Sequence, residues 1–254
     1  MIIKTLCLCE IFFTHISEAL SCFCMWEKIW HQFHEFTNIP LPFLLMSCIL
    51  GLWHWQRLSK PFQVVVIYLI FNFLIEIGAR VAGMVYRQNL PLLHLYTFGE
   101  CLLFSLFYRQ ILDDSSVFKR YFGWILGAVL TLVALNTLFL QNIFEYNSYA
   151  KTLVQVLIIL YALDYAFRFS EREDSFSGQR QPLRLFNAAV LIYYCGSLFI
   201  FMSSKFDLEM QGAILILWKI NAILNLIFQL MVLVALWKSI FSQQKSSSSQ
   251  ASAF

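Results

Sequence analysis

The residues that could do chemistry are polar side chains placed inside long apolar stretches. Glu76 and Arg80 lie in one such stretch, and His94, Tyr96 and Glu100 lie in the next. A charged group at the centre of a bilayer costs about 2.5–3.5 kcal/mol on insertion scales, so each needs a partner, water or a role. An imidazole and a carboxylate can exchange protons, and together with a phenol they can bind a small polar ligand.

Helical spacing decides which of these side chains can act together. Glu76 and Arg80 are four residues apart, so they share a helix face and can neutralise each other with no further role. Glu100 has no cation three or four residues away, so it is either neutral or paired with a donor from another helix. We expect the second, with Arg80, Asn221 and Asn225 as candidate donors. The two asparagines share a face, and hydrogen bonding between helices is the alternative reading for them.

The elements that position these residues must be membrane helices. Of the 254 residues, 59% are hydrophobic and only 13% are charged, against about 25% charged in an ordinary soluble domain. Too few polar side chains exist to coat a water-facing surface, which excludes a soluble enzyme and a disordered protein. The net charge of +3 provides no dense basic patch, so we expect no nucleic-acid partner. The lipid bilayer is the expected partner.

Seven apolar runs predict an all-α, polytopic bundle of seven transmembrane helices, because a span needs about 20 apolar residues. The runs are 39–56, 62–82, 90–112, 121–140, 149–169, 185–203 and 212–241. They predict one membrane domain over residues 25–241. Residues 1–24 are interrupted by charges and predict an extension or an interfacial segment, so the start is either Met1 or Met25. Residues 242–254 are rich in serine and predict a disordered cytoplasmic tail.

Lysine and arginine between the runs fall mostly on one side, which predicts an outside N-terminus and a cytoplasmic C-terminus. The cations on the predicted cytoplasmic side are Arg57, Lys60, Arg109, Lys119, Arg120, Arg168, Arg172, Arg180, Arg184, Lys238 and Lys245. The cations on the other side are Lys4, Lys28, Arg87, Lys151 and Lys205.

This orientation places most of the buried polar residues in the outer half of the bundle, and it predicts an outward-facing polar cavity there. Glu100 is expected to line that cavity together with Glu76 and the two asparagines of the last run. Asp164, by contrast, lies near the predicted cytoplasmic end of the fifth run, four residues before Arg168. That spacing predicts a structural ion pair.

The sequence gives no sign of a metal or a cofactor, and we expect neither. The pairs Cys7/Cys9 and Cys22/Cys24 could bind a metal or form disulfides, but neither has the C-x-x-C spacing of a zinc site. The phosphate-binding, zinc-protease and nucleophile-elbow motifs are absent. A retinal protein would place a lysine in the last span. However, Lys219 lies near the outer end of its run and has leucine four residues earlier.

Three motifs resemble those of known membrane proteins. They are NLPLLHLYT at 89–97 followed by Glu100, LIYYCGS at 191–197, and LWKIN at 217–221 followed by Asn225. Together they resemble a group of uncharacterised seven-span integral membrane proteins of bacteria, over about residues 25–241. The resemblance implies seven spans in a bacterial inner (plasma) membrane, and it implies no assigned activity.

Three functions fit these observations. The first is a sensor or accessory membrane protein that binds a small polar ligand, or a partner, from the outer side and signals through a membrane or cytoplasmic partner. The residues assigned to its ligand site are Glu76, Arg80, His94, Tyr96, Glu100, Asn221 and Asn225. The second is a small-solute or proton-coupled transporter, which needs a polar path to both sides. The third is an intramembrane enzyme, which needs His94 and Glu100 to converge on one cavity as acid and base.

Overall fold

The helices of the protein follow the apolar runs. The computed structural model describes residues 39–170, 180–203 and 211–251, and this described part is helical and contains no strand. The elements are α2 (Pro40–Trp53), the 3-10 helix η1 (Trp55–Arg57), α3 (Lys60–Tyr86), α4 (Leu90–Ile111), α5 (Val117–Arg120), α6 (Phe122–Leu135), the π-helix η2 (Asn136–Leu140), α7 (Ser148–Ser170), α8 (Gln181–Ser203) and α9 (Gln211–Ala251). Segment 1–24, with both C-x-C pairs, lies outside the described residues.

Residues with fixed or special backbone geometry set the ends of these helices. Extended Ser59 followed by a proline in the first turn begins α3, because proline needs no hydrogen-bond acceptor there. Arg87 ends the same helix in the left-handed conformation, with φ at 54°. Another first-turn proline begins α4. The hydroxyl of Ser116 accepts a hydrogen bond from the backbone N–H of Lys119 and so caps α5.

Six of the described helices are long and apolar enough to cross a membrane, which confirms a helical, multi-pass membrane protein. The candidate spans are Lys60–Tyr86, Leu90–Ile111, Phe122–Leu140, Ser148–Arg168, Gln181–Ile200 and Ile216–Phe241. The predicted first span is represented by α2, which has 14 residues. A helix of that length reaches only about 21 Å, against about 30 Å for the hydrocarbon core. The count of seven spans is therefore not confirmed, and the orientation stays a prediction.

Helix α9 is longer than the apolar run that predicts it. It has 41 residues and continues to Ala251, through most of the stretch predicted to be a disordered tail. A helix already formed by the apolar segment adds one hydrogen bond for each further residue without a new nucleation cost, so even a serine-rich stretch can extend it.

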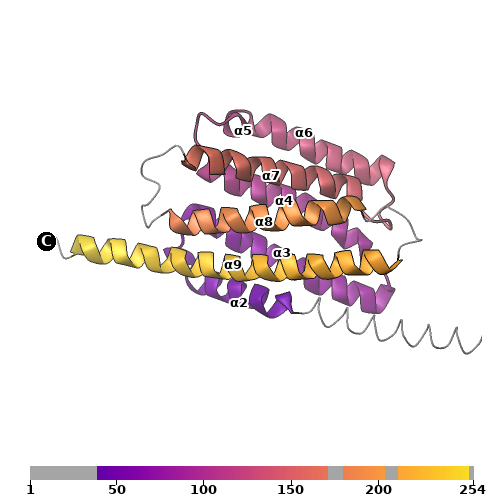
Figure 1. The fold of residues 1–254 in the computed structure, drawn as a ribbon, viewed down its shortest axis with the longest axis horizontal. Helices are drawn as coiled ribbons and strands as arrows, with labels where there is room; N and C mark the ends of the chain where they lie inside the picture. The colour runs from indigo at the N-terminus through magenta and orange to yellow at the C-terminus, as the bar shows by residue number, and fades with distance from the viewer. Residues whose placement is uncertain (1–38, 171–179, 204–210, 252–254) are drawn as a thin grey trace, which may run out of the picture. The chain divides into compact units, whose positions relative to one another are not determined.

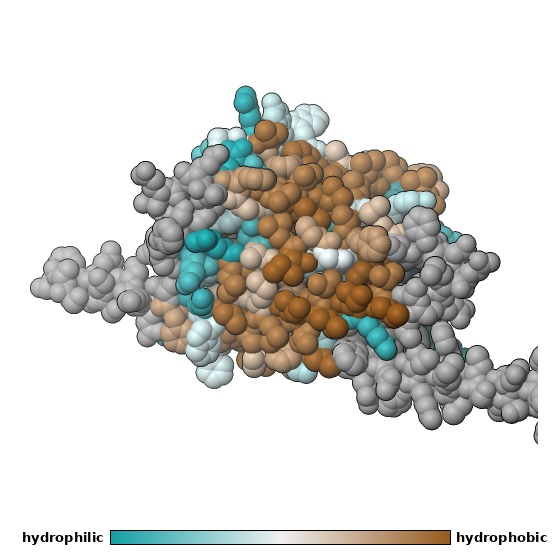
Figure 2. Space-filling model, viewed as in Figure 1, coloured by the Kyte–Doolittle hydropathy of each residue, from teal (hydrophilic) through white to brown (hydrophobic). Residues whose placement is uncertain are grey.

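The described helices from Pro40 onward belong to one compact unit. Six of these helices form a ring in which each packs against the next, and the ring closes where α9 meets α2. Their order around the ring is α2, α3, α4, α7, α8 and α9. Helix α6 packs on the outside of the ring, against α4 and α7. Figure 1 shows α7, α8 and α9 in front of α3 and α4, with α6 along the upper edge. Figure 2 shows a broad apolar band over this face, with polar residues gathered towards its ends.

Aromatic side chains fill the space enclosed by the six helices. Phe104 of α4 packs edge-on against Tyr194 of α8, at 5.3 Å between ring centroids, and also contacts Phe186 of the same helix. Phe228 brings α9 into the same cluster through its contacts with both α8 residues. The core beside the polar residues is therefore built of large, rigid side chains, which hold the helices at fixed positions.

Candidate functional site

A buried ion pair joins three helices in the middle of the bundle. The Lys151 ammonium of α7 donates to Oε2 of Glu100 on α4 at 2.5 Å, and the Tyr194 hydroxyl of α8 donates to Oε1 at 2.7 Å. Relative exposure is 0% for the glutamate side chain and 1% for the lysine side chain. Each carboxylate oxygen therefore has its own charged or polar donor. This confirms a donor from another helix for Glu100, but the donors are Lys151 and Tyr194 instead of Arg80 or the asparagines.

An aromatic face lies on the other side of the lysine. The Lys151 ammonium lies 4.5 Å from the ring centroid of Tyr96, which is the geometry of a cation–π contact. The Tyr96 hydroxyl in turn lies 3.2 Å from the Tyr68 hydroxyl of α3. We call Glu100, Lys151, Tyr194 and Tyr96 the buried cluster. It connects α4, α7 and α8 directly, and it reaches α3 through Tyr68.

The position of Lys151 runs against local helix preference. It is the fourth residue of α7, where the positive end of the helix dipole disfavours a cation by about 0.3–1 kcal/mol. Withdrawing both charges from water costs more, so a buried ion pair is weak evidence for stability. Ionisable groups inside a membrane are by default candidates for function, and the buried cluster is such a candidate.

The connection from α6 to α7 fixes the start of α7 and with it Lys151. The Asn136 side-chain amide donates to Gln141 Oε1 at 2.9 Å and to Asn147 Oδ1 at 3.1 Å, and all three residues are buried. The backbone carbonyl of Asn147 then accepts from the backbone N–H of Lys151. Asn136 opens the π-helical turn η2, a distortion often found at functional sites. The connection is thus a folded, hydrogen-bonded unit.

His94 holds this connection instead of facing Glu100. Its Nδ1 lies 3.0 Å from the Thr137 hydroxyl, and its Nε2 lies 3.4 Å from the backbone oxygen of Glu145. Glu100 has its contacts on α7 and α8, so no described contact joins the two residues. The convergence that an acid–base pair requires is not found among the described contacts, and His94 acts here as a positioning residue.

The other residues assigned to the outer cavity lie on α3 and α9. Arg80 pairs with Glu76 at 2.9 Å within α3, as their spacing predicts, and both side chains are partly exposed. Asn221 and Asn225 lie on α9, which packs against α8 and α2. The side-chain oxygen of Asn221 is buried without a hydrogen-bond partner among the described residues. Glu100 takes its two hydrogen bonds from α7 and α8, and its expected place beside Glu76 and the asparagines stays a prediction.

Buried polar contacts continue from the buried cluster towards the other end of the bundle. One turn after Lys151, the Gln155 side chain donates to the Ser197 hydroxyl at 2.9 Å. Further along, Tyr108 of α4 donates to Asn187 of α8 at 2.8 Å, and the Asn187 side chain donates to the Ala162 carbonyl at 3.1 Å. Polar side chains thus follow the α4–α7–α8 interface along much of its length.

The end of this interface carries the ion pair predicted between Asp164 and Arg168. Their Oδ1 and Nε atoms lie 2.7 Å apart, which confirms the pair. Asp164 also accepts from the Ser116 hydroxyl at 2.6 Å, and Arg168 donates to the Ser115 hydroxyl at 2.7 Å. The pair therefore holds the α4–α5 loop against α7.

Sequence reasoning missed Lys151, which it counted among the cations of an outer loop. The signal that could have found it is the i, i+4 spacing of Lys151 and Gln155, which places two polar residues on one face of an apolar run. Tyr194 was visible only as part of the LIYYCGS motif. Removing Lys151 from the loop cations enlarges the charge difference on which the predicted orientation depends.

Comparisons of the chain with protein-family models, with curated proteins and with solved structures found no match.

Proposed function

We propose that the protein is a membrane sensor that binds a small anionic ligand from the outer side, with the buried cluster as the element that responds. The single observation that supports this is the complete burial of Glu100 and Lys151 on two different helices. This pair holds α4 against α7 only while the Lys151 ammonium stays in contact with the Glu100 carboxylate. An anionic ligand competes with Glu100 for the Lys151 ammonium and so favours a second arrangement of these helices.

The helices can respond together because the Glu100 carboxylate is bound by residues of two other helices. Tyr194 and Lys151 bind different oxygens of one carboxylate, so displacing Glu100 releases α4 from α7 and α8 together. Rigid aromatic packing beside the pair favours a step between two packed states over a gradual deformation. A ligand can shift the balance only as far as it binds the second state better. We infer that the protein passes this change to a signalling partner in the membrane or the cytoplasm.

A second candidate function is proton-coupled transport of a small solute. The observation that favours it is the run of buried polar contacts from Gln155–Ser197 to Tyr108–Asn187. A transporter needs a polar path to both sides, and these contacts extend the polar residues beyond the half that holds Glu100.

The experiment is a ligand screen on the full chain in lipid nanodiscs. Thermal unfolding is measured with small mono- and dicarboxylates, and with chloride at equal ionic strength. We expect one carboxylate class to raise the unfolding temperature. Lys151→Gln should abolish that rise, and Arg184→Gln, which removes an exposed cation near the start of α8, should keep it. Ligands that stabilise the Lys151→Gln protein equally would contradict the proposal.

Helix movement is measured separately by spin labels at two exposed positions, Leu95 on α4 and Tyr149 on α7, in a cysteine-free background. The ligand should change the distance between the labels in the parent protein. Proton uptake into liposomes that carries a solute with it, and that is lost in Glu100→Gln, would favour the transporter instead.

A further inference from the structure

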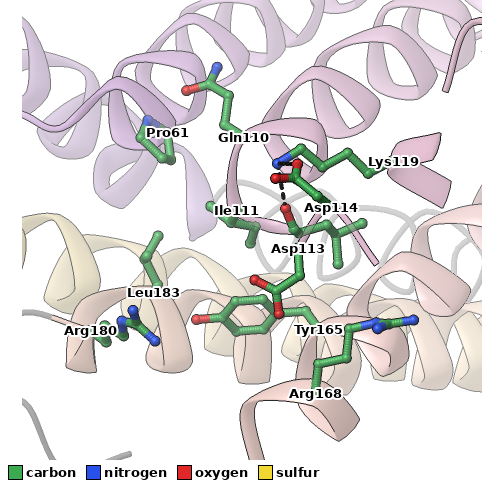
Figure 3. A pocket seen from close by; sticks show the side chains of 11 residues that line it. Pro61, Gln110, Ile111, Asp113, Asp114, Lys119, Tyr165, Arg168, Arg180 and Leu183 are labelled. Atoms are coloured by element: carbon green, nitrogen blue, oxygen red, sulfur yellow. Dashed lines mark hydrogen bonds and ion pairs between the residues drawn. The ribbon is translucent and has the colours of Figure 1, made fainter. Parts of the chain in front are cut away.

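A cavity opens at the end of the bundle opposite to the predicted outer half. Its volume is about 340 Å³, which is within the range of small-molecule sites. It lies where α4 and α7 end and where α3 and α8 begin, and the α4–α5 loop forms one wall (Figure 3). Its polar lining residues are Gln110, Asp113, Asp114, Lys119, Tyr165, Arg168 and Arg180. None of them belongs to the buried cluster.

Most charges around this cavity are already paired within the protein. The Lys119 ammonium binds Asp114 at 2.9 Å and the backbone oxygen of Leu112 at 2.9 Å. The hydrogen bond from Lys119, and its charge, hold the pKa of the Asp114 carboxyl below its ordinary value. Asp113 is also engaged in a contact within the chain. Lys119 thus neutralises Asp114, and both aspartates belong to the loop wall of the cavity.

Arg168 is occupied as well, by Asp164 and the Ser115 hydroxyl. Arg180, at the start of α8, differs from it, because it makes no ion pair within the described part of the chain. Its guanidinium lies on the side of the cavity towards which the Tyr165 hydroxyl points (Figure 3). A guanidinium presents a planar fork of donors that matches the oxygens of a phosphate or carboxylate.

We propose that this cavity binds a phosphate group, held by the guanidinium fork of Arg180 with the Tyr165 hydroxyl beside it. The location selects the ligand chemistry. The cavity lies at the ends of the spanning helices, which is the depth of the lipid headgroups, and basic pockets between spans at that depth bind headgroup phosphates. An anionic phospholipid is therefore the expected source, and free inorganic phosphate is the other source with the same chemistry.

The test uses the full chain in nanodiscs and has two arms. The first arm compares thermal unfolding in phosphatidylglycerol and in phosphatidylcholine nanodiscs. The second arm titrates inorganic phosphate, against chloride at equal ionic strength, in phosphatidylcholine nanodiscs. Arg180→Gln should weaken the apparent phosphate affinity roughly tenfold, which is the loss expected for a charge-assisted hydrogen bond. The matched control is Arg184→Gln, an exposed position one turn further along α8 that does not line the cavity.

The proposal is supported if stabilisation is lost in Arg180→Gln and kept in Arg184→Gln. The arm in which stabilisation occurs identifies the source of the phosphate group, a phospholipid or inorganic phosphate. The proposal is overturned if neither arm shows stabilisation, or if both variants lose it equally, since that result reports only the general charge of this end. Where Arg180→Gln does not fold, Arg180→Lys keeps the charge but loses the fork. Unchanged phosphate affinity in Arg180→Lys would then overturn the assignment to the guanidinium.

Discussion

Removing one member of the Glu100–Lys151 pair should be costly, whereas removing both should cost little. The atoms that carry the pair lie 2.5 Å apart. At an effective dielectric constant of 20, two unit charges at that distance attract by about 7 kcal/mol. Placing each charge inside the membrane costs about 3 kcal/mol on insertion scales. The pair as a whole is therefore close to neutral for stability, as is common for buried ion pairs.

The same numbers set the expected result for each variant. Lys151→Met or Glu100→Gln loses the attraction of about 7 kcal/mol and regains about 3 kcal/mol, so each single change should destabilise the fold by about 4 kcal/mol. The double variant loses the attraction once and regains both penalties, for a net cost of about 1 kcal/mol. The coupling energy between the two sites should therefore approach the strength of the pair itself.

The assay is a double-mutant cycle on the purified full chain. The free energy of unfolding is measured in mixed micelles with increasing denaturing detergent, for the parent protein, both single variants and the double variant. Asp114→Asn serves as the control, because its pair with Lys119 lies in the α4–α5 loop outside the candidate spans and should contribute little to stability. Additive single effects, each within about 0.5 kcal/mol of zero, would show that Glu100 and Lys151 do not form a buried ion pair.

Three further outcomes are expected. Tyr194→Phe keeps the ring but removes a hydrogen bond to the buried carboxylate, so the same unfolding assay should show a loss of about 2 kcal/mol. Gly51→Ala places a methyl group in a clash with a methyl of the fully buried Val66 and should destabilise by about 1–3 kcal/mol, while Gly127→Ala, with nothing within 4 Å, should not. Because its folded pKa is lowered, Asp114 stabilises the loop above the ordinary pKa and loses this effect as pH falls through the lowered value. Lys119→Met should return its NMR titration to the ordinary range.

Local spacing in the sequence determined the features that lie within a single helix, which are the helices themselves and the ion pairs between residues four positions apart. The apolar runs predict the helices because about 20 such residues are needed to cross a bilayer. The pairs Glu76–Arg80 and Asp164–Arg168 are both predicted from a spacing of four residues, and both are confirmed. These interactions need no information about neighbouring helices, since the helix itself brings the side chains together.

Only the tertiary structure decided which helices meet and therefore which polar residues become partners. Glu100 and Lys151 are 51 positions apart in the chain, and Tyr194 is 94 positions from Glu100. A spanning helix is apolar on most of its surface, so its sequence does not mark the face that will turn inward. The order of helices around the ring places α7 beside α4, so that Lys151 of α7 and Tyr194 of α8 reach Glu100. That order results from packing among many side chains, which no spacing within a single run encodes.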